Sequence, residues 1–208
     1  YDMLAGIIAE GANYGNLVSD CKEKIQVEYV SANPTGPLHV GHGRGAAVGS
    51  ALANLMKAAG MNVSREYYIN DAGNQINNLA ASVNARYLEQ LGQTVEFPEN
   101  GYHGHDIIET AERIVRIYGD RFLNMSEEER IKEFRTIALK EKLAALKEDL
   151  EAFNVTYDEW FSEQTLHDAN AIKNACDLLT ERGYLYEEGG ALWLKATEYG
   201  DDKDRVVI

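Results

Sequence analysis

The fold is decided by residues 25–69, which read IQVEYVSANPTGPLHVGHGRGAAVGSALANLMKAAGMNVSREYYI. The run Ile25–Val30 is rich in β-formers and predicts a strand, whereas Asn33–Pro37 holds two prolines that exclude regular structure. The pattern of His42–Ala59 predicts a helix, and Asn62–Ile69 predicts a second strand. Strand, loop, helix and strand form a βαβ unit, so we expect parallel strands joined by a right-handed crossover.

A helical block follows the second strand and interrupts the α/β pattern. We expect helices at Asp71–Leu91, with Asp71 as a reasonable N-cap, at Asp106–Tyr118 and at Ser126–Phe153. The last of these opens with the Ser-x-x-Glu signature of a capping box, and its charges alternate in sign as on a solvated helix face. This block is predicted to be a helical subdomain inserted into the α/β fold.

The α/β pattern resumes near the C-terminal end. Val155–Tyr157 predicts a short third strand, Leu166–Arg182 a helix, and Tyr184–Ile208 short strands joined by Gly189-Gly190 and an acidic turn. The predicted fold class is α/β, a partial Rossmann-like parallel sheet with a helical insertion. The expected parts are a linker or domain end at 1–20, the first βαβ part at 21–75, the helical insertion at 76–153, the continued Rossmann-like part at 154–182, and the start of a β-rich second insertion at 183–208.

Composition limits the class of protein. The 208 residues are 45% hydrophobic and 26% charged, as in ordinary globular proteins. No apolar run approaches the length of a membrane span, and no signal peptide is visible, so we expect no membrane association. Cys21 and Cys176 lack metal-ligand spacing and are expected to be reduced thiols of a cytosolic protein, with a disulfide as the less favoured alternative. Neither end looks native, so we expect a fragment of a longer protein.

The net charge of −14 argues against a large nucleic-acid surface on this chain, because phosphate binding favours Lys and Arg. An acidic surface instead favours a cationic small substrate through weak long-range attraction. Contacts with RNA would therefore come from a local basic patch or from parts of the protein outside this sequence.

Two histidines, His39 and His42, stand where the predicted helix begins. The N-terminus of a helix after the first strand of a βαβ unit binds phosphate, and imidazoles there can stabilise charge that develops on phosphate oxygens. Small residues at Gly36, Gly41 and Gly43 would let a nucleotide approach the backbone. A lone His-x-x-His is usually incidental, and the spacing is wrong for a zinc pair on a helix, so the surrounding loop carries the prediction.

Four stretches are similar to arginyl-tRNA synthetases of the bacterial type, a family of class I aminoacyl-tRNA synthetases. The most specific are Val27–Arg44, which contains the His-x-Gly-His signature, and Glu66–Gln75. Asp158–Glu163 and Gly190–Val206 support the same resemblance, which extends from about Glu10 to the last residue. The resemblance implies ATP-dependent formation of arginyl adenylate and transfer of arginine to tRNA(Arg), with activation that generally needs bound tRNA.

The resemblance also implies roles for individual residues. Catalytic roles fall to His39 and His42, whose rings would contact ATP phosphates. The predicted ATP-binding residues are Pro37, His39, Gly41, His42, Gly43 and Arg44. The predicted arginine-binding residues are Glu28, Ser31, Asn33, Asp71 and Gln75, with Gly73 beside the last two. The sequence leaves open whether Glu28 binds the positive charge of arginine or is a surface carboxylate at a strand end, and whether Asp71 also caps a helix.

The implied ligands are L-arginine, ATP with Mg²⁺ and tRNA(Arg), in a cytoplasmic monomer with no metal site of its own. The family's Lys-Met-Ser-Lys-Ser-like loop and anticodon-binding domain are absent from this sequence. Two alternatives remain: a small-molecule nucleotidyltransferase with the same His-x-x-His loop, and a non-catalytic module that retains ATP or arginine affinity.

Other conspicuous residues have ordinary interpretations. We expect Trp160, Phe161 and Trp193 to be core residues and His103, His105 and His167 to be loop or surface residues. Asp201, Asp202 and Asp204 are interleaved with Lys203 and Arg205, and such an acidic turn is usually solvated.

Overall fold

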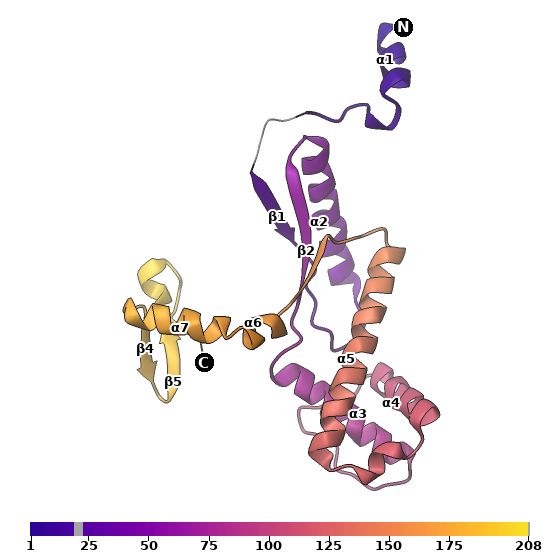
Figure 1. Ribbon diagram of the computed structural model, residues 1–208, viewed down its shortest axis with the longest axis vertical. Helices are drawn as coiled ribbons and strands as arrows, with labels where there is room; N and C mark the ends of the chain where they lie inside the picture. The colour runs from indigo at the N-terminus through magenta and orange to yellow at the C-terminus, as the bar shows by residue number, and fades with distance from the viewer. Residues whose placement is uncertain (19–22, 208) are drawn as a thin grey trace. The chain divides into compact units, whose positions relative to one another are not determined.

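The computed structural model describes residues 1–18 and 23–207 (Figure 1). Two compact units make up the chain, Tyr1–Ser162 and Glu163–Ile208. Their division falls inside the segment 154–182 that the sequence assigns to the continued Rossmann-like part. Among the described residues, no helix has the length and apolar character needed to cross a membrane.

The first unit contains a parallel sheet of β1 (Lys24–Glu28), β2 (Asn62–Ile69) and β3 (Glu159–Ser162) in the order β1-β2-β3. Val27 pairs with Arg65, and the register continues to Glu28 opposite Glu66. Helix α2 (Val40–Ala58) connects β1 to β2. The expected α/β class and the parallel pairing of the first two strands are therefore confirmed, and all three strands end at one edge of the sheet.

The helical insertion consists of α3 (Asn74–Gln90), α4 (His105–Tyr118), the short 3₁₀ turn η2 (Arg121–Asn124) and α5 (Glu127–Ala152). Its core is built from large apolar side chains on the three α-helices and on η2: Leu79, Val83, Tyr87, Ile107, Ile114, Phe122 and Phe134. Ser126 caps α5, and the predicted capping box is present because the Ser126 hydroxyl and the Glu129 carboxylate each accept a backbone N–H.

Helix α5 connects this insertion to the sheet. Its 26 residues span about 39 Å at about 1.5 Å per residue, and Figure 1 shows it running from the α3–α4 pair to the sheet. Phe134 belongs to the core of the insertion, whereas Leu150 packs in a second core with Tyr29, Tyr67 and Val155. One face of α5 is therefore buried along its length, while the other carries exposed charges such as Glu133 and Glu148, as the alternating charges indicated.

Two buried cations on that face have partners within the insertion. The Lys142 ammonium lies 2.6 Å from the Asp106 carboxylate, and the Arg130 guanidinium donates to the Asn84 amide oxygen over 2.5 Å. Pairing is required because an isolated buried charge would be strongly destabilising. These contacts fix how α5 packs on α3 and α4, and so position the end of α5 that reaches the sheet.

Three local predictions are wrong. The third strand is Glu159–Ser162, not Val155–Tyr157; Val155 is buried after a left-handed turn at Asn154 and has no place in the ladder. Asp71 does not cap α3, because that helix begins at Asn74 and its N-cap is Gly73, which has a positive φ of 79°. The predicted helix Leu166–Arg182 is interrupted at Asn170, which takes a left-handed conformation with φ 52°.

The second unit packs the short helix α6 (Gln164–Asp168) and α7 (Ala171–Glu181) with the antiparallel strands β4 (Leu185–Glu188), β5 (Ala191–Leu194) and β6 (Arg205–Val206). Gly189 and Gly190, with φ 62° and 81°, form the predicted tight turn between β4 and β5. Cys176 is a buried free thiol in α7, and Cys21 lies outside the described residues.

The N-terminal segment forms α1 (Asp2–Glu10) and the 3₁₀ turn η1 (Gly11–Asn13). This segment falls within residues 1–20, for which the sequence predicts a linker or domain end. Most of its apolar side chains, including Met3 and Ile8, are exposed.

Candidate functional site

The start of α2 is organised by the two histidines. His39 is the N-cap: its Nδ1 accepts the Gly41 N–H over 3.1 Å, while its own backbone N–H donates to Nδ1 of His42 over 3.2 Å. Both Nδ1 atoms are therefore acceptors, so each neutral ring carries its proton on Nε2. The two Nε2–H donors lie on the sides of the rings that do not hold the backbone.

The same two rings stack on each other, with centroids 3.7 Å apart and planes 18° apart. Burial, and secondarily the charge that His39 would carry, lowers the pKa of His42 below its ordinary value of 6.5. His42 is thus kept neutral at pH 7, the state that the capping hydrogen bond requires. A pair of neutral donors at a helix N-terminus is suited to hydrogen bonding with phosphate oxygens.

Small residues shape the helix next to this pair. Gly43 and Gly45 face open space, since nothing lies within 4 Å of where a Cβ would stand. At Gly41 a Cβ would meet the His39 ring at 2.9 Å. A cavity of about 290 Å³ lies beside His39 and Gly43, with Asp149 of α5 on its opposite wall. The start of α2 therefore has room for a ligand against its backbone.

The other predicted ATP-binding residues are only partly gathered around that cavity. Pro37 is exposed and lines a separate cavity of about 320 Å³ against α4 and α5. Arg44 is exposed on the first turns of α2. Gly41 and Gly43 lie on the helix between the histidines and Arg44.

The turn between β1 and the proline-containing loop has an uncommon backbone. Val30 and Ser31 both have positive φ, 68° and 40°, a conformation that costs of the order of 1–3 kcal/mol per non-glycine residue. The Ser31 hydroxyl oxygen accepts the Tyr68 N–H over 3.0 Å, and the Ser31 N–H donates to the Tyr29 carbonyl over 3.0 Å. Ser31, predicted to bind arginine, therefore holds the loop against β2 where β1 has ended.

The remaining predicted arginine-binding residues lie around the edge where the strands end. Glu28 is exposed at the last position of β1, and Asn33 is exposed in the loop that follows. Asp71 follows β2 and is buried, and its carboxylate accepts the Ser162 hydroxyl at the end of β3 over 2.6 Å. Gln75 is exposed in the first turn of α3. In open parallel sheets, ligands bind at this edge.

Sequence reasoning missed two tyrosines, the buried Tyr67 and the half-buried Tyr157, and one glycine beside the site. The Tyr67 hydroxyl donates to the Ala32 carbonyl over 2.9 Å, and the Tyr157 hydroxyl donates to the Tyr29 carbonyl over 3.1 Å. A Cβ at Gly49 would lie 2.2 Å from the Tyr29 ring, so α2 can approach β1 this closely only with glycine there. The alternation of residues in β2 indicates which tyrosine faces inward, but nothing in the sequence identifies its hydrogen-bond partner.

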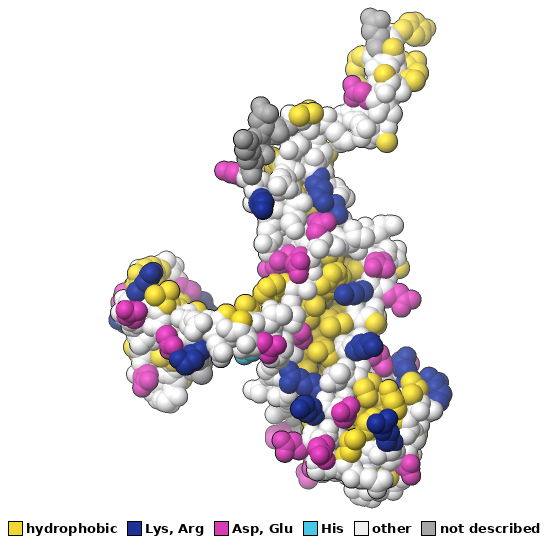
Figure 2. All heavy atoms as spheres, viewed as in Figure 1, with side chains coloured by type: hydrophobic (Ala, Val, Ile, Leu, Met, Phe, Trp, Pro, Cys, Tyr) yellow, Lys and Arg dark blue, Asp and Glu magenta, His cyan; other side chains and the backbone are white. Residues whose placement is uncertain are grey.

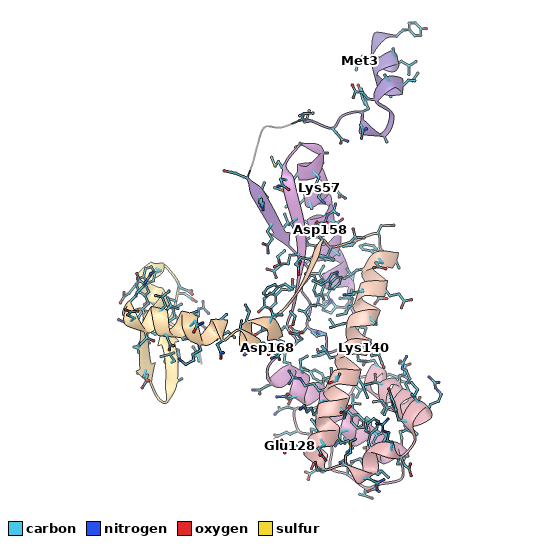
Figure 3. All side chains as sticks on the ribbon, viewed as in Figure 1. Met3, Lys57, Glu128, Lys140, Asp158 and Asp168 are labelled. Atoms are coloured by element: carbon cyan, nitrogen blue, oxygen red, sulfur yellow. The ribbon has the colours of Figure 1, made fainter. Side chains whose placement is uncertain are left out.

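At the opposite side of the sheet, where the strands begin, an ion pair links α2 to the residue before β3. Lys57 of α2 and Asp158, just before β3, form an ion pair of 3.5 Å (Figure 3). The Arg65 N–H donates to the Asp158 carboxylate. This hydrogen bond, together with the charge of Lys57, lowers the pKa of Asp158. On the face shown in Figure 2, basic and acidic side chains are interspersed over the first unit.

The aromatic residues predicted to lie in the core and the histidines predicted to lie in loops or on the surface mostly do so. Trp160 packs on Tyr67 with centroids 4.5 Å apart, although it, Phe161 and Trp193 are half-buried and not fully in a core. His103 and His167 are exposed, and His105 is also exposed, as the first residue of α4.

The acidic turn of the second unit has internal partners. Asp201 and Asp202 pair with Arg205, and the Arg205 hydrogen bonds hold the pKa of Asp201 below its usual range. Asp204 accepts hydrogen bonds from Thr197 and Tyr186. Among the residues the structure describes, no three His, Cys, Asp or Glu side chains form a group that could hold a metal ion.

A parallel sheet whose first crossover helix begins with paired imidazole donors and open glycines defines a Rossmann-like nucleotide-binding class of protein. A sequence model described as the catalytic domain of class I (R) tRNA synthetases matches residues 3–208. The chain is 56% identical to the arginine–tRNA ligase of Carboxydothermus hydrogenoformans over 202 residues and 54% identical to that of Listeria welshimeri over 207. The chain therefore belongs to the arginyl-tRNA synthetase family of class I tRNA synthetases.

Solved structures agree with this assignment. A candidate arginyl-tRNA synthetase from Campylobacter jejuni matches all of the chain with a TM-score of 0.85 and 35% identity, over 45% of its own length. Thermus thermophilus arginyl-tRNA synthetase matches 92% of the chain with a TM-score of 0.61, over 33% of its length; at 24% identity it supports the fold. The chain spans only part of the length of its curated relatives. The match to the Carboxydothermus hydrogenoformans ligase covers 97% of the chain but 36% of that protein, and the match to the Listeria welshimeri ligase covers 100% of the chain but 37% of that protein.

Proposed function

We propose that the full-length protein is an arginine–tRNA ligase. It would activate L-arginine with ATP to arginyl adenylate, releasing pyrophosphate, and then transfer arginine to a terminal ribose hydroxyl of tRNA(Arg), releasing AMP. The single observation that carries the proposal is the pair of Nε2 donors presented by His39 and His42 at the N-terminus of α2. The protein would act as a cytoplasmic monomer, with most tRNA contacts supplied by parts beyond this chain.

The fit of ATP rests on the first turns of α2. Gly41 and Gly43 have no side chains next to His39 and His42, and the cavity of about 290 Å³ beside His39 and Gly43 would receive part of the nucleotide. Pro37 and Arg44 would flank the phosphates. Mg²⁺ bound with ATP would neutralise charge on the phosphate oxygens.

The arginine carboxylate is already ionised, so the first step needs no general base. It attacks the α-phosphorus of ATP, and the bond to the pyrophosphate oxygen breaks. The two imidazole donors would hold the phosphate oxygens on which negative charge builds. Most of what the site contributes is then orientation and charge stabilisation.

Arginine itself would bind at the edge where the strands end. Asn33 and Ser31 would hold its amino and carboxylate groups, and Glu28 would meet the guanidinium, which favours paired carboxylate oxygens. Asp71 and Gln75 would close the pocket from the β2 side. The buried Asp71 is oriented by the Ser162 hydroxyl, so it presents a fixed carboxylate.

Arginine-dependent exchange of pyrophosphate into ATP tests the proposal, measured on the full-length protein with and without tRNA(Arg). Exchange that needs arginine and is not supported by lysine would support a synthetase. Exchange driven instead by a phosphorylated metabolite would indicate a small-molecule nucleotidyltransferase. ATP or arginine binding without any exchange would indicate the non-catalytic alternative.

A further inference from the structure

The turn Tyr29–Ala32 keeps its left-handed backbone although neither residue with positive φ is a glycine. A valine at φ 68° is unfavourable because its branched Cβ crowds the backbone, so the surrounding structure must hold the turn in place. Hydrogen bonds from other segments reach both ends of the turn and its centre.

Two of those bonds come from the hydroxyls of Tyr67, which is buried, and Tyr157, which is half-buried. Tyr157 donates to the Tyr29 carbonyl over 3.1 Å, at the first peptide of the turn. Tyr67 donates to the Ala32 carbonyl over 2.9 Å, and this carbonyl belongs to the peptide that leads directly into Asn33. Because a peptide unit is planar, fixing that carbonyl also fixes the N–H and Cα of Asn33.

The tyrosines are themselves rigid. Tyr67 is fully buried, stacks on Trp160 at 4.5 Å and meets the Tyr157 ring edge-on at 5.3 Å. Burial raises the pKa of Tyr67 to about 12, so its hydroxyl keeps the proton that it donates. Rings packed in this way cannot follow the loop if it moves, so they act as fixed anchors.

We propose that Tyr67 and Tyr157 are positioning residues, which hold the turn Tyr29–Ala32 and thereby set where Ser31 and Asn33 stand in the arginine site. The proposal rests on the proposed function, because it assigns the purpose of the anchoring to arginine binding. His39 and His42 are held separately by their own capping box, so the ATP end of the site should not depend on the tyrosines.

A matched control exists in the helical insertion. Tyr87 is also fully buried and also donates its hydroxyl to a backbone carbonyl, that of Gly119, over 2.9 Å. Tyr67→Phe, Tyr157→Phe and Tyr87→Phe each remove one hydroxyl and keep the ring. A general loss of stability would affect all three variants alike, whereas a positioning role would separate the first two from the third.

The experiment measures arginine-dependent pyrophosphate exchange for these variants of the full-length enzyme. Tyr67→Phe and Tyr157→Phe should raise the KM for arginine roughly three- to tenfold, the effect of losing one hydrogen bond, while the KM for ATP stays unchanged. Tyr87→Phe should leave both values unchanged. An unchanged arginine KM in Tyr67→Phe, or an equal rise in Tyr87→Phe, would overturn the proposal.

Amide hydrogen exchange over residues 29–33 separates this proposal from the proposed function. Tyr67→Phe should speed exchange there, and Tyr87→Phe should not. A wild-type enzyme without arginine-dependent activity would refute the proposed function. The amide hydrogen exchange rates would then decide by themselves whether the tyrosines hold the turn. Unaltered amide hydrogen exchange at residues 29–33 in Tyr67→Phe would show that the tyrosines do not hold the turn.

Discussion

The imidazole rings of His39 and His42 lie face to face, 3.7 Å between centroids, and each accepts a backbone N–H through Nδ1 at the start of α2. The pair is thus both a helix cap and a set of outward donors. This double use makes the structural and chemical contributions of each histidine separable by the choice of substitution.

His42→Ala should lower kcat for arginine activation by about 10²-fold, the usual scale for losing one transition-state donor. It also removes the acceptor of the His39 N–H, worth about 1 kcal/mol of helix stability. His42→Gln is the matched variant, because glutamine at this third helical position can accept the same N–H without supplying an imidazole. Both variants should lose activity in pyrophosphate exchange, but only His42→Ala should lose stability. A wild-type rate in His42→Gln would refute a catalytic role for the ring.

Acidification should weaken the start of α2. The pKa of His42 is lower in the folded protein than in the unfolded chain, so the unfolded chain binds more protons below pH 6.5. The stability contributed by neutral His42 is therefore complete above pH 6.5 and is lost as the pH falls through its lowered folded value. An NMR titration of the His42 ring should show a midpoint below 6.5 and a neutral form protonated at Nε2.

The charge that a protonated His39 would carry is the second cause of the lowered pKa of His42, and substitution of His39 removes it. In His39→Asn the cap is retained, since asparagine is a good N-cap residue. The His42 midpoint should then rise, while staying below 6.5 because burial is the larger cause. A midpoint that does not rise would show that the rings do not interact electrostatically.

The βαβ unit could be predicted because its signals are local: a β-rich run, a proline-containing loop, a helix pattern and a second β-rich run. The sequence pattern predicts that α2 begins at His42, whereas the helix begins at Val40; histidine is seldom an N-cap, and the capping role of His39 depends on ring geometry. Local signals therefore gave the order of elements, and side-chain contacts decided where one element began.

The third strand shows the limit of such signals. Val155 is apolar because it is buried against Tyr67 and Leu150, not because it pairs with a strand. Its apolar character cannot distinguish burial from pairing, and β3 gains its partners from β2, far away in the sequence. The roles of Glu28, Asn33 and Gln75 follow from family resemblance and stay predictions, whereas the hydrogen bond of Tyr67 to Ala32 joins residues 35 positions apart and leaves no local signal in the sequence.

Asn33→Ala should raise the KM for arginine roughly 10- to 100-fold, the range expected when a hydrogen bond to a charged group is lost. Asn33 is exposed, so its loss should change the free energy of unfolding little. Asn124→Ala, at an exposed asparagine in η2 of the helical insertion, is the control and should leave arginine binding unaltered. Equal arginine KM values for the two variants would remove Asn33 from the proposed site.

Gly49 and Gly45 lie one turn apart on α2 but should respond oppositely to alanine. At Gly49 a Cβ would lie 2.2–2.6 Å from three atoms of the Tyr29 side chain, which is anchored under the loop, so Gly49→Ala should lower the free energy of unfolding by about 1–3 kcal/mol. At Gly45 nothing lies within 4 Å, so Gly45→Ala should raise it by about 0.5–1 kcal/mol through helix propensity. Urea unfolding of both variants measures the difference. If Gly49→Ala were as stable as Gly45→Ala, Tyr29 would have room to yield, and the close packing of α2 on β1 would not depend on glycine.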